Sequence, residues 1–256
     1  MLIVLMSKIS PSRAKMAHFT PKCVILFALA RFAILTVIVR MSPIFAIFVQ
    51  LSSNDMETRH MAIFASGNGS NAENLIHYFN SRDIGWKVAV VVCNKPDAGV
   101  LDRARRLGVP SVVMPKLLFS QQQALAKVMD DYAIDAVVLA GFLLMIPSWL
   151  IARYPQRIIN IHPSLLPKYG GRGMYGRHVH EAVVAAGETE SGITIHLVNE
   201  DVDGGRILFQ AKTPVTPTDT PADLETKIHR LEQQYFPQVV ASTLTTTSTI
   251  PIPLPE

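Results

Sequence analysis

Three polar residues in this chain are of the types that can act together on a carbonyl group. Asn160 and His162 stand two positions apart at the end of the apolar run 156–161, and Asp203 lies in an acidic turn before two glycines. Residues two apart in a strand point to the same side of a sheet. Pro163 ends the hydrogen bonding of the strand directly after His162. We therefore predict that Asn160 and His162 face a cleft at the carboxyl end of a strand, the edge at which open α/β sheets bind ligands.

These side chains suit the attack of an amine on a carbonyl carbon. The carbonyl oxygen gains negative charge during the attack, and an asparagine amide together with a protonated imidazole would stabilise that charge. Because His162 must then be charged near neutral pH, we expect a carboxylate to raise its pKa, and Asp203 is the candidate. General acid–base catalysis of this kind contributes about 10²–10⁴-fold to a rate. No serine or cysteine stands in a recognisable nucleophile elbow, which favours direct transfer over a covalent intermediate.

A glycine-rich loop offers a second binding element. Residues 66–71 read SGNGSN, and Gly67, Gly69 and Ala72 have the spacing of the dinucleotide fingerprint. A dinucleotide would need an acid at the end of the second strand, where residues 93–95 read CNK instead. A single phosphomonoester bound by the amides at the start of the following helix needs no such acid, and we favour it. A plain tight turn is the alternative.

Strand and helix patterns alternate along the chain from residue 61 onward. Apolar and β-branched runs predict strands at 62–65, 88–93, 111–114, 135–140 and 156–161. Helical spacing predicts helices at 72–79, 101–107 and 120–132. Two further strands are expected at 193–198 and 207–211. This alternation predicts an α/β fold, a single Rossmann-like domain with a mainly parallel twisted sheet flanked by helices.

A capping signal predicts the last helix. It consists of a cap residue, a proline at the first helical position and an acid at the third, namely Thr220, Pro221 and Asp223. Apolar residues at helical spacing form the expected core face, Leu224, Ile228, Leu231 and Tyr235. A polar stripe is expected beside that face, formed by Glu225, His229 and Glu232.

The charge of the chain is concentrated in its first 60 residues. The formal net charge of +4 suggests nucleic-acid binding. However, residues 1–60 hold seven Lys or Arg and two acidic residues, whereas the remainder holds 17 basic and 18 acidic residues. The remainder has no basic stripe interleaved with aromatic residues, so nucleic acid is not an expected partner. Cys23 and Cys93 each lie in an apolar run and are too few for a disulfide framework, which favours reduced thiols and a cytoplasmic location.

The first 60 residues form an apolar extension. Residues 23–39 are apolar except for Arg31 and Thr36, and a second apolar run follows at 41–51. One interpretation is a membrane anchor or an uncleaved targeting segment. An arginine in the middle of a membrane span costs about 2.5–3.5 kcal/mol, which argues against this interpretation.

The favoured interpretation leaves this extension out of the mature protein. Met56 or Met61 would then begin a chain that leads directly into the first strand. We therefore expect three parts: a leader at 1–60, a folded domain at 61–240 and a flexible tail at 241–256, where Thr, Ser and Pro are frequent.

Four segments carry a resemblance to a known family. In chain order they are 66–71 (SGNGSN), 139–142 (LAGF), 160–169 (NIHPSLLPKY) and 201–205 (DVDGG). Together, over about residues 61–240, they resemble the folate-dependent phosphoribosylglycinamide formyltransferase family. The resemblance implies transfer of a formyl group from the co-substrate 10-formyltetrahydrofolate to the amine of 5'-phosphoribosylglycinamide in purine biosynthesis, with no metal.

The resemblance also implies roles for individual residues. Asn160 would hold the formyl oxygen, His162 would be the acid that stabilises the tetrahedral intermediate, and Asp203 would keep His162 protonated. Four residues would bind glycinamide ribonucleotide, namely Gly69, Ser70, Asn71 and Glu232. The folate would contact Leu143, Leu144, Met145, Ile146, Asn160, Asn199, Glu200, Asp201, Val202 and Asp203.

Two segments depart from the family pattern. Many members have an arginine that contacts the folate after the third strand, whereas this chain has Gln121, Gln122 and Gln123 there. Whether Gln122 replaces that contact stays open. The loop 170–177 (GGRGMYGR) is longer than in the shortest relatives, and its glycines suggest a flexible cover.

Three further histidines stand outside the predicted catalytic group. His178 and His180 are two apart at a predicted helix start, so they do not share a helical face, and no third metal ligand is evident. His196 alternates with apolar residues in a predicted strand, which favours a hydrogen-bonded structural role.

Other functions are compatible with parts of this pattern. Within the same fold, methionyl-tRNA formyltransferase would need a further C-terminal domain and formyltetrahydrofolate hydrolase a larger N-terminal domain. A membrane-anchored, non-catalytic binding protein that uses the leader would tolerate loss of His162. We expect small-molecule substrates as partners. Membrane contact is expected only if residues 1–60 are part of the mature protein, and a homodimer is an open option.

Overall fold

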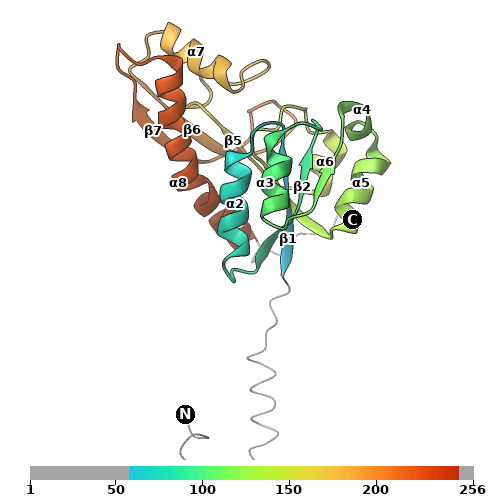
Figure 1. Ribbon diagram of the computed structural model, residues 1–256. Helices are drawn as coiled ribbons and strands as arrows, with labels where there is room; N and C mark the ends of the chain where they lie inside the picture. Colours follow the sequence, from blue (N-terminus) through green and yellow to red (C-terminus); the bar gives the residue numbers. More distant parts are fainter. Residues whose placement is uncertain (1–57, 248–256) are drawn as a thin grey trace, which may run out of the picture. The chain divides into compact units, whose positions relative to one another are not determined.

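Seven strands form one sheet in the computed structural model, which describes residues 58–247 (Figure 1). The strand order is β3-β2-β1-β4-β5-β6-β7, with parallel pairing from β3 to β5 and antiparallel pairing from β5 to β7. The prediction of an α/β fold with a mainly parallel sheet is confirmed. The strands are β1 (Arg59–Ala65), β2 (Trp86–Cys93), β3 (Ser111–Val113), β4 (Ile134–Leu139), β5 (Ile158–His162), β6 (Glu190–Leu197) and β7 (Ile207–Pro214).

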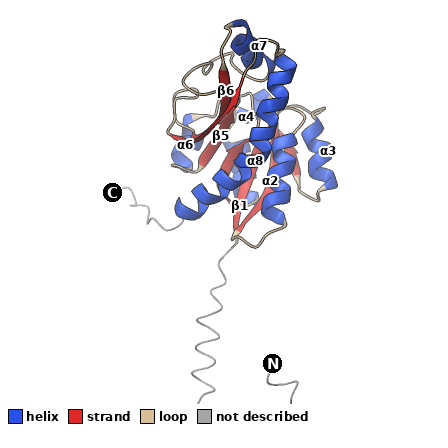
Figure 2. Cartoon of the chain, turned by 90° about the vertical axis from the view of Figure 1, so that its left-hand side faces the viewer, coloured by secondary structure: helices blue, strands red, loops and turns tan. Residues whose placement is uncertain are grey.

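Helices cover both faces of the sheet. Alternate residues of β1 serve two cores, because Met61 and Ile63 pack on one face while Ala62 and Phe64 pack on the other. The first face is covered by α2 (Ser70–Asn80), α3 (Gly99–Arg106), α7 (Arg177–Ala185) and α8 (Pro221–Thr247) (Figure 2). The second face is covered by α4 (Lys116–Phe119), α5 (Gln122–Asp131) and α6 (Ser148–Arg153). Each helix turns its apolar side to the sheet.

The order of the strands creates a crevice between β1 and β4. The chain moves outward from β1 through β2 to β3, then returns across the sheet to place β4 on the other side of β1. The loops after β1 and β4 therefore leave the sheet in opposite directions, and the space between them is where open α/β sheets hold ligands. The backbone of Ser66 donates to the carbonyl of Gly141 at 3.1 Å and ties the two loops together.

The last helix is longer than expected. The predicted capping box is present, because the backbone of Thr220 donates to Asp223 Oδ2 and the backbone of Asp223 donates to Thr220 Oγ1. Within the described residues α8 continues to Thr247, and Leu244 is buried. The expected tail boundary at 240 is therefore corrected, since apolar residues beyond it pack against the same core.

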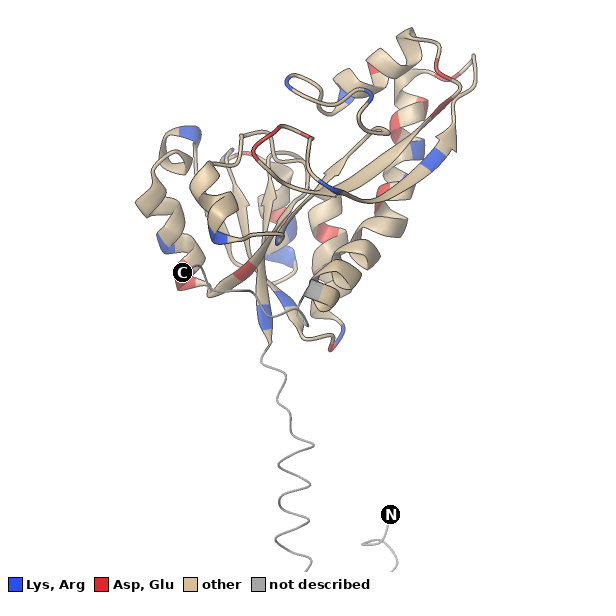
Figure 3. Ribbon diagram, turned by 180° about the vertical axis from the view of Figure 1, so that it is seen from behind, with Lys and Arg blue, Asp and Glu red and all other residues tan. Residues whose placement is uncertain are grey.

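The expected leader at 1–60 lies almost entirely outside the described residues. β1 begins at Arg59, so a chain starting at Met61 would lack two residues of that strand, whereas one starting at Met56 would retain it. Cys93 is buried at the end of β2, as predicted, whereas Cys23 lies outside the described residues. No helix of the described part is long and apolar enough to cross a membrane. Lys and Arg are spread over several helices, strands and loops (Figure 3).

Candidate active site

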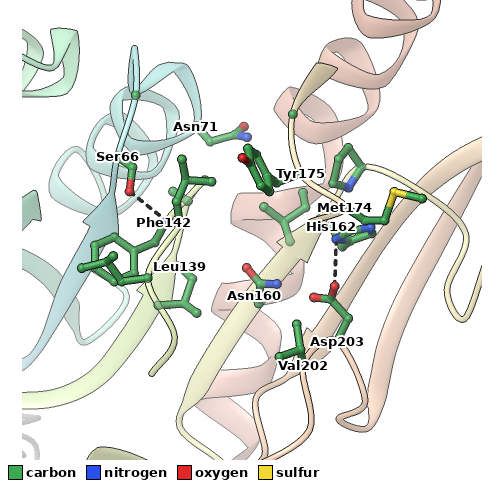
Figure 4. Close-up of a pocket in the computed structure, with 18 of the residues that line it drawn as sticks. Ser66, Asn71, Leu139, Phe142, Asn160, His162, Met174, Tyr175, Val202 and Asp203 are labelled. Carbon is green, nitrogen blue, oxygen red and sulfur yellow. Dashed lines mark hydrogen bonds and ion pairs between the residues drawn. The ribbon is translucent and has the colours of Figure 1, made fainter. Parts of the chain in front are cut away.

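A cavity of about 740 Å³ opens at the carboxyl ends of β1, β4 and β5 (Figure 4). This volume is within the range of small-molecule sites. All the residues expected to bind or act on substrates contribute to its walls, although they come from segments far apart in the chain. They are Gly69, Ser70, Asn71, Leu143, Leu144, Met145, Ile146, Asn160, His162, Asn199, Glu200, Asp201, Val202, Asp203 and Glu232.

His162 is the last residue of β5 and is 4% exposed. Its Nε2 donates a hydrogen bond to the carbonyl oxygen of Tyr169 at 2.7 Å, so this nitrogen carries a proton. Its Nδ1 lies 3.5 Å from Asp203 Oδ2 (Figure 4). The ring is thus held between a carbonyl and a carboxylate, and addition of a second proton would convert the Asp203 contact into an ion pair.

The expected protonation state of His162 needs correction. Burial is the dominant influence and lowers the pKa of His162 below its ordinary value of 6.5, whereas Asp203 and the carbonyl of Tyr169 raise it by less. His162 is therefore mainly neutral at pH 7 in the ligand-free site. The sequence indicated the carboxylate but not the extent of burial, and removal from water disfavours the charged form.

Asn160 is oriented by His196, a residue that sequence reasoning had assigned a structural role. His196 Nδ1 lies 2.9 Å from the carbonyl oxygen of Leu197, which can only accept, so Nδ1 carries a proton. His196 Nε2 then accepts from Asn160 Nδ2 at 3.0 Å. The predicted hydrogen bonding of His196 is confirmed. His196 belongs to the site because it pairs with Asn160 across the antiparallel strands β5 and β6. Strand alternation alone did not reveal His196 as the partner of Asn160.

Asp203 is fixed by several neighbours. Its Oδ2 accepts from the backbone of Gly171 at 2.9 Å, and its Oδ1 lies 3.6 Å from His196 Nε2. Burial alone would raise the pKa of Asp203, but the neighbouring imidazoles of His196 and His162 and the Gly171 amide outweigh it and lower the pKa. Asp203 is therefore ionised at neutral pH.

The glycine loop places the first turn of α2 at the cavity. Gly69 has φ +81°, and a Cβ there would lie 2.5 Å from Val100 Cγ2, so only glycine fits. The helix begins at Ser70, where the first backbone N–H groups have no partners within the helix and attract anions. This geometry suits the phosphate interpretation of the loop.

A polar network joins α2 to α8 at the same end of the cavity. Asn71 Nδ2 donates to Glu232 Oε2 at 2.9 Å, and His229 Nδ1 lies 2.8 Å from the same oxygen. Hydrogen bonding to Glu232 raises the pKa of His229. Glu232 is 6% exposed, so it faces the cavity from the protein interior and not from a solvated stripe.

The opposite end of the cavity is apolar and open. Leu143, Met145 and Val202 are 45%, 58% and 39% exposed. The loop that carries Leu143 is anchored, because the backbone N–H of Leu143 donates to Ser66 Oγ at 2.9 Å. This end offers apolar surface to a flat ligand without a closed wall over it.

The two departures from the family pattern lie in different surroundings. Gln121, Gln122 and Gln123 are exposed and do not belong to the cavity walls of the described chain. The loop 171–176, by contrast, lines the cavity along its whole length. Tyr175 in this loop is 48% exposed and packs its ring against His178 at 5.4 Å.

His178 and His180 lie on different faces of α7, as predicted. His178 is exposed and lies 3.7 Å from Glu181, whereas His180 is buried and lines the cavity. His180 was not among the predicted site residues, although two histidines at this spacing point to opposite sides of a helix. Among residues 58–247, no group of three or more His, Cys, Asp or Glu could hold a metal ion.

Comparisons with known proteins agree on one family. The formyl transferase family matches residues 59–240. The chloroplastic phosphoribosylglycinamide formyltransferase of Arabidopsis thaliana is 39% identical over 196 residues, which cover 75% of this chain and 67% of that protein. The phosphoribosylglycinamide formyltransferase of Haemophilus influenzae is 38% identical, and the match covers 71% of this chain and 85% of that protein. The structure of the phosphoribosylglycinamide formyltransferase from Bacillus halodurans matches with a TM-score of 0.67 at 32% identity, covering 74% and 97%.

Proposed function

This chain belongs to the formyl transferase family, among the phosphoribosylglycinamide formyltransferases, and we propose how its cavity performs their reaction. The enzyme transfers the formyl group of 10-formyltetrahydrofolate, its co-substrate, to the amine of 5'-phosphoribosylglycinamide in purine biosynthesis. One observation carries the assignment of the site: the paired His162 and Asp203, together with Asn160, line the same cavity as the start of α2. A formyl-transfer centre and a phosphate site are therefore within reach of one substrate.

We assign the stabilisation of the tetrahedral intermediate to Asn160 and His162. Asn160 uses one N–H on His196 and retains the other for the formyl oxygen. As that oxygen becomes negative, its charge and that of Asp203 both favour the protonated form of His162, which is neutral before the reaction. His162 thus becomes charged where the charge is needed, and Asp203 acts by holding and stabilising the ring.

The ribose phosphate is assigned to the start of α2. The backbone N–H groups of Gly69, Ser70 and Asn71 meet the positive end of the helix dipole there. Glu232, which already accepts from Asn71, is assigned to the polar groups of the same substrate. With the phosphate at α2, the amine of the substrate would point towards Asn160 and His162.

The folate is assigned to the open apolar end. Leu143, Leu144, Met145 and Ile146 supply one wall, and the turn Asn199–Asp203 supplies the other. The ring system of the folate would cover the exposed parts of Leu143 and Met145, and this burial provides binding energy. Backbone groups of the two loops would provide orientation.

We further propose that residues 59–247 form the catalytic domain, that it acts in the cytoplasm, and that its partners are its small-molecule substrates. Membrane contact would depend on the leader at 1–60. A homodimer remains open to measurement by light scattering.

The test uses the full-length chain and follows folate absorbance after mixing 10-formyltetrahydrofolate with glycinamide ribonucleotide. We expect turnover that requires both substrates. Release of formate without glycinamide ribonucleotide would indicate the hydrolase instead. A shortened chain, residues 56–256, measured in parallel tests whether catalysis needs the leader. Equal activity would show that catalysis does not need the leader. Loss of activity in a folded protein would show that the leader is part of the function.

A further inference from the structure

We propose that His180 accepts the proton that the ammonium group of glycinamide ribonucleotide must lose before it attacks the formyl carbon. The inference rests on the proposed function, since it concerns the amine of that substrate. An amine of this type is largely protonated at neutral pH, and an ammonium nitrogen has no free electron pair for the attack. A base next to the amine would raise the fraction of substrate that can react.

His180 lies in the first turns of α7 and is 3% exposed. It lines the cavity that also contains Asn160, His162 and Glu232. Its Nδ1 is buried and has no hydrogen-bond partner within the described residues. A buried polar atom without a partner is unfavourable, and among the four such atoms of the described residues His180 Nδ1 alone belongs to a residue of the cavity wall. A bound substrate group would supply the missing partner.

The other histidines of the cavity and Glu232 are already engaged. His162 contacts Tyr169 and Asp203, and His196 contacts Leu197 and Asn160. Glu232 receives hydrogen bonds from α2 and α8 through one oxygen, and His229 is one of the donors. Of the four imidazoles that line the cavity in the described chain, His180 alone has a buried ring nitrogen without a partner.

The surroundings of His180 suit a base that receives and releases a proton. Burial lowers the pKa of His180, so the ring is mainly neutral at pH 7 and has a free electron pair. Glu225 and Glu232 of α8 act in the opposite direction and favour the charged form once a proton arrives, while His229 of α8 and His162 of β5 disfavour it. His178 and Glu181 on α7 are exposed and pair with each other.

The proton balance of the reaction is simple. The ammonium transfers one proton to a nitrogen of His180, and the freed electron pair forms the bond to the formyl carbon while the carbonyl electrons move to oxygen. The carbonyl then re-forms, and the bond between the formyl carbon and N10 of the folate breaks. N10 receives the second proton of the amine. His180 releases the first proton to solvent, so one proton leaves per turnover.

The test compares His180→Gln with a matched control, His178→Gln, on the same helix. The measurement is kcat/KM for glycinamide ribonucleotide from pH 6 to pH 9. We expect His180→Gln to lose about tenfold at pH 7, because an amine with an ordinary α-amino pKa of about 8 is roughly one-tenth unprotonated at that pH. The loss should shrink as pH rises, because the free amine becomes abundant without the help of a base. His178→Gln should follow the wild type throughout.

Two results would overturn the proposal. A loss that is constant across pH would indicate a packing role for His180, and wild-type kinetics at every pH would indicate no role. Melting temperatures of all variants report on folding, and His180→Asn serves as a second variant if His180→Gln fails to fold. Wild-type protein without formyl transfer would instead contradict the proposed function, so the two failures are distinguishable.

Discussion

The two ends of the cavity are built in opposite ways. At the catalytic end, His162 and His196 are almost fully buried, and hydrogen bonds and charges within the protein fix Asn160 and Asp203. At the folate end, Leu143 and Met145 remain about half exposed. One end is complete before a ligand arrives, whereas the other offers apolar surface that a ligand would cover.

This contrast indicates how binding energy and catalysis are divided. Groups that stabilise a transition state are most effective when they are held in place beforehand, because no reorganisation is then needed during the reaction. Apolar surface acts through its removal from water, which only the ligand can bring about. Changes at the buried end should therefore reduce kcat, and changes at the open end should raise KM.

The largest effect is expected from His162→Ala. Loss of the ring removes the group that becomes charged as the oxyanion forms, and we expect kcat to fall by about 10²–10⁴-fold. KM for the folate should change little, since the apolar end is untouched. Steady-state kinetics with circular dichroism as a folding control provide the measurement. A variant with a raised KM and an unchanged kcat would contradict the division between the two ends.

Asn160→Ala should have the next largest effect. Removal of one donor from an oxyanion site typically costs about 10²–10³-fold in kcat. Because His196 orients the amide, His196→Ala should reproduce part of this loss while retaining Asn160. A double variant tests the coupling: if His196 acts through Asn160, the two losses should be less than additive in free energy. Full additivity would show that His196 acts independently.

The catalytic strand was predictable from sequence because its signals are local. Strand alternation placed Asn160 and His162 on one side, and Pro163 fixed the end of the strand. The partners of these residues were harder to predict. His196 reaches Asn160 through antiparallel pairing, and Gly171 reaches Asp203 from a loop 32 residues away in sequence. Sequence spacing does not reveal such contacts.

Burial was the main quantity that sequence reasoning could not supply. The carboxylate near His162 was predicted, but the expected rise in the pKa of His162 was wrong. Removal of the ring from water lowers that pKa by more than the charge of Asp203 raises it. The same reason explains Glu232, expected in a polar stripe and found buried against α2. The open end rested on the family resemblance, which implied folate contacts for residues 143–146, and that role stays a prediction.

A third prediction concerns stability in acid. Burial keeps the folded-state pKa of His162 and of His180 below 6.5, so the unfolded chain binds protons first as pH falls below about 6.5, and acid favours unfolding. The lowered pKa of Asp203 acts in the same direction at lower pH, whereas the raised pKa of His229 opposes it. We expect the melting temperature of the wild type to fall from pH 7 to pH 5.

Variants separate these contributions. His162→Gln should lose stability less steeply over the same pH range than the wild type, because one of the groups that resist protonation is gone. Met145→Ala, at the open end, should keep the wild-type slope. Scanning calorimetry at several pH values provides the measurement. Equal slopes for His162→Gln and the wild type would mean that the buried end does not set the acid sensitivity.

The smallest effect is expected from Met145→Ala. Met145 is 58% exposed without ligand, so its truncation removes little from the folded protein, and the melting temperature should hardly change. A folate that covers this side chain would lose about 1 kcal/mol of apolar contact, which corresponds to roughly a fivefold rise in KM at unchanged kcat. Leu117→Ala is the matched control, because Leu117 is 74% exposed on α4 and lies outside the cavity walls of the described chain. Should Met145→Ala lower kcat instead, the folate end would take part in positioning the formyl group, and the contrast between the two ends would be one of exposure alone.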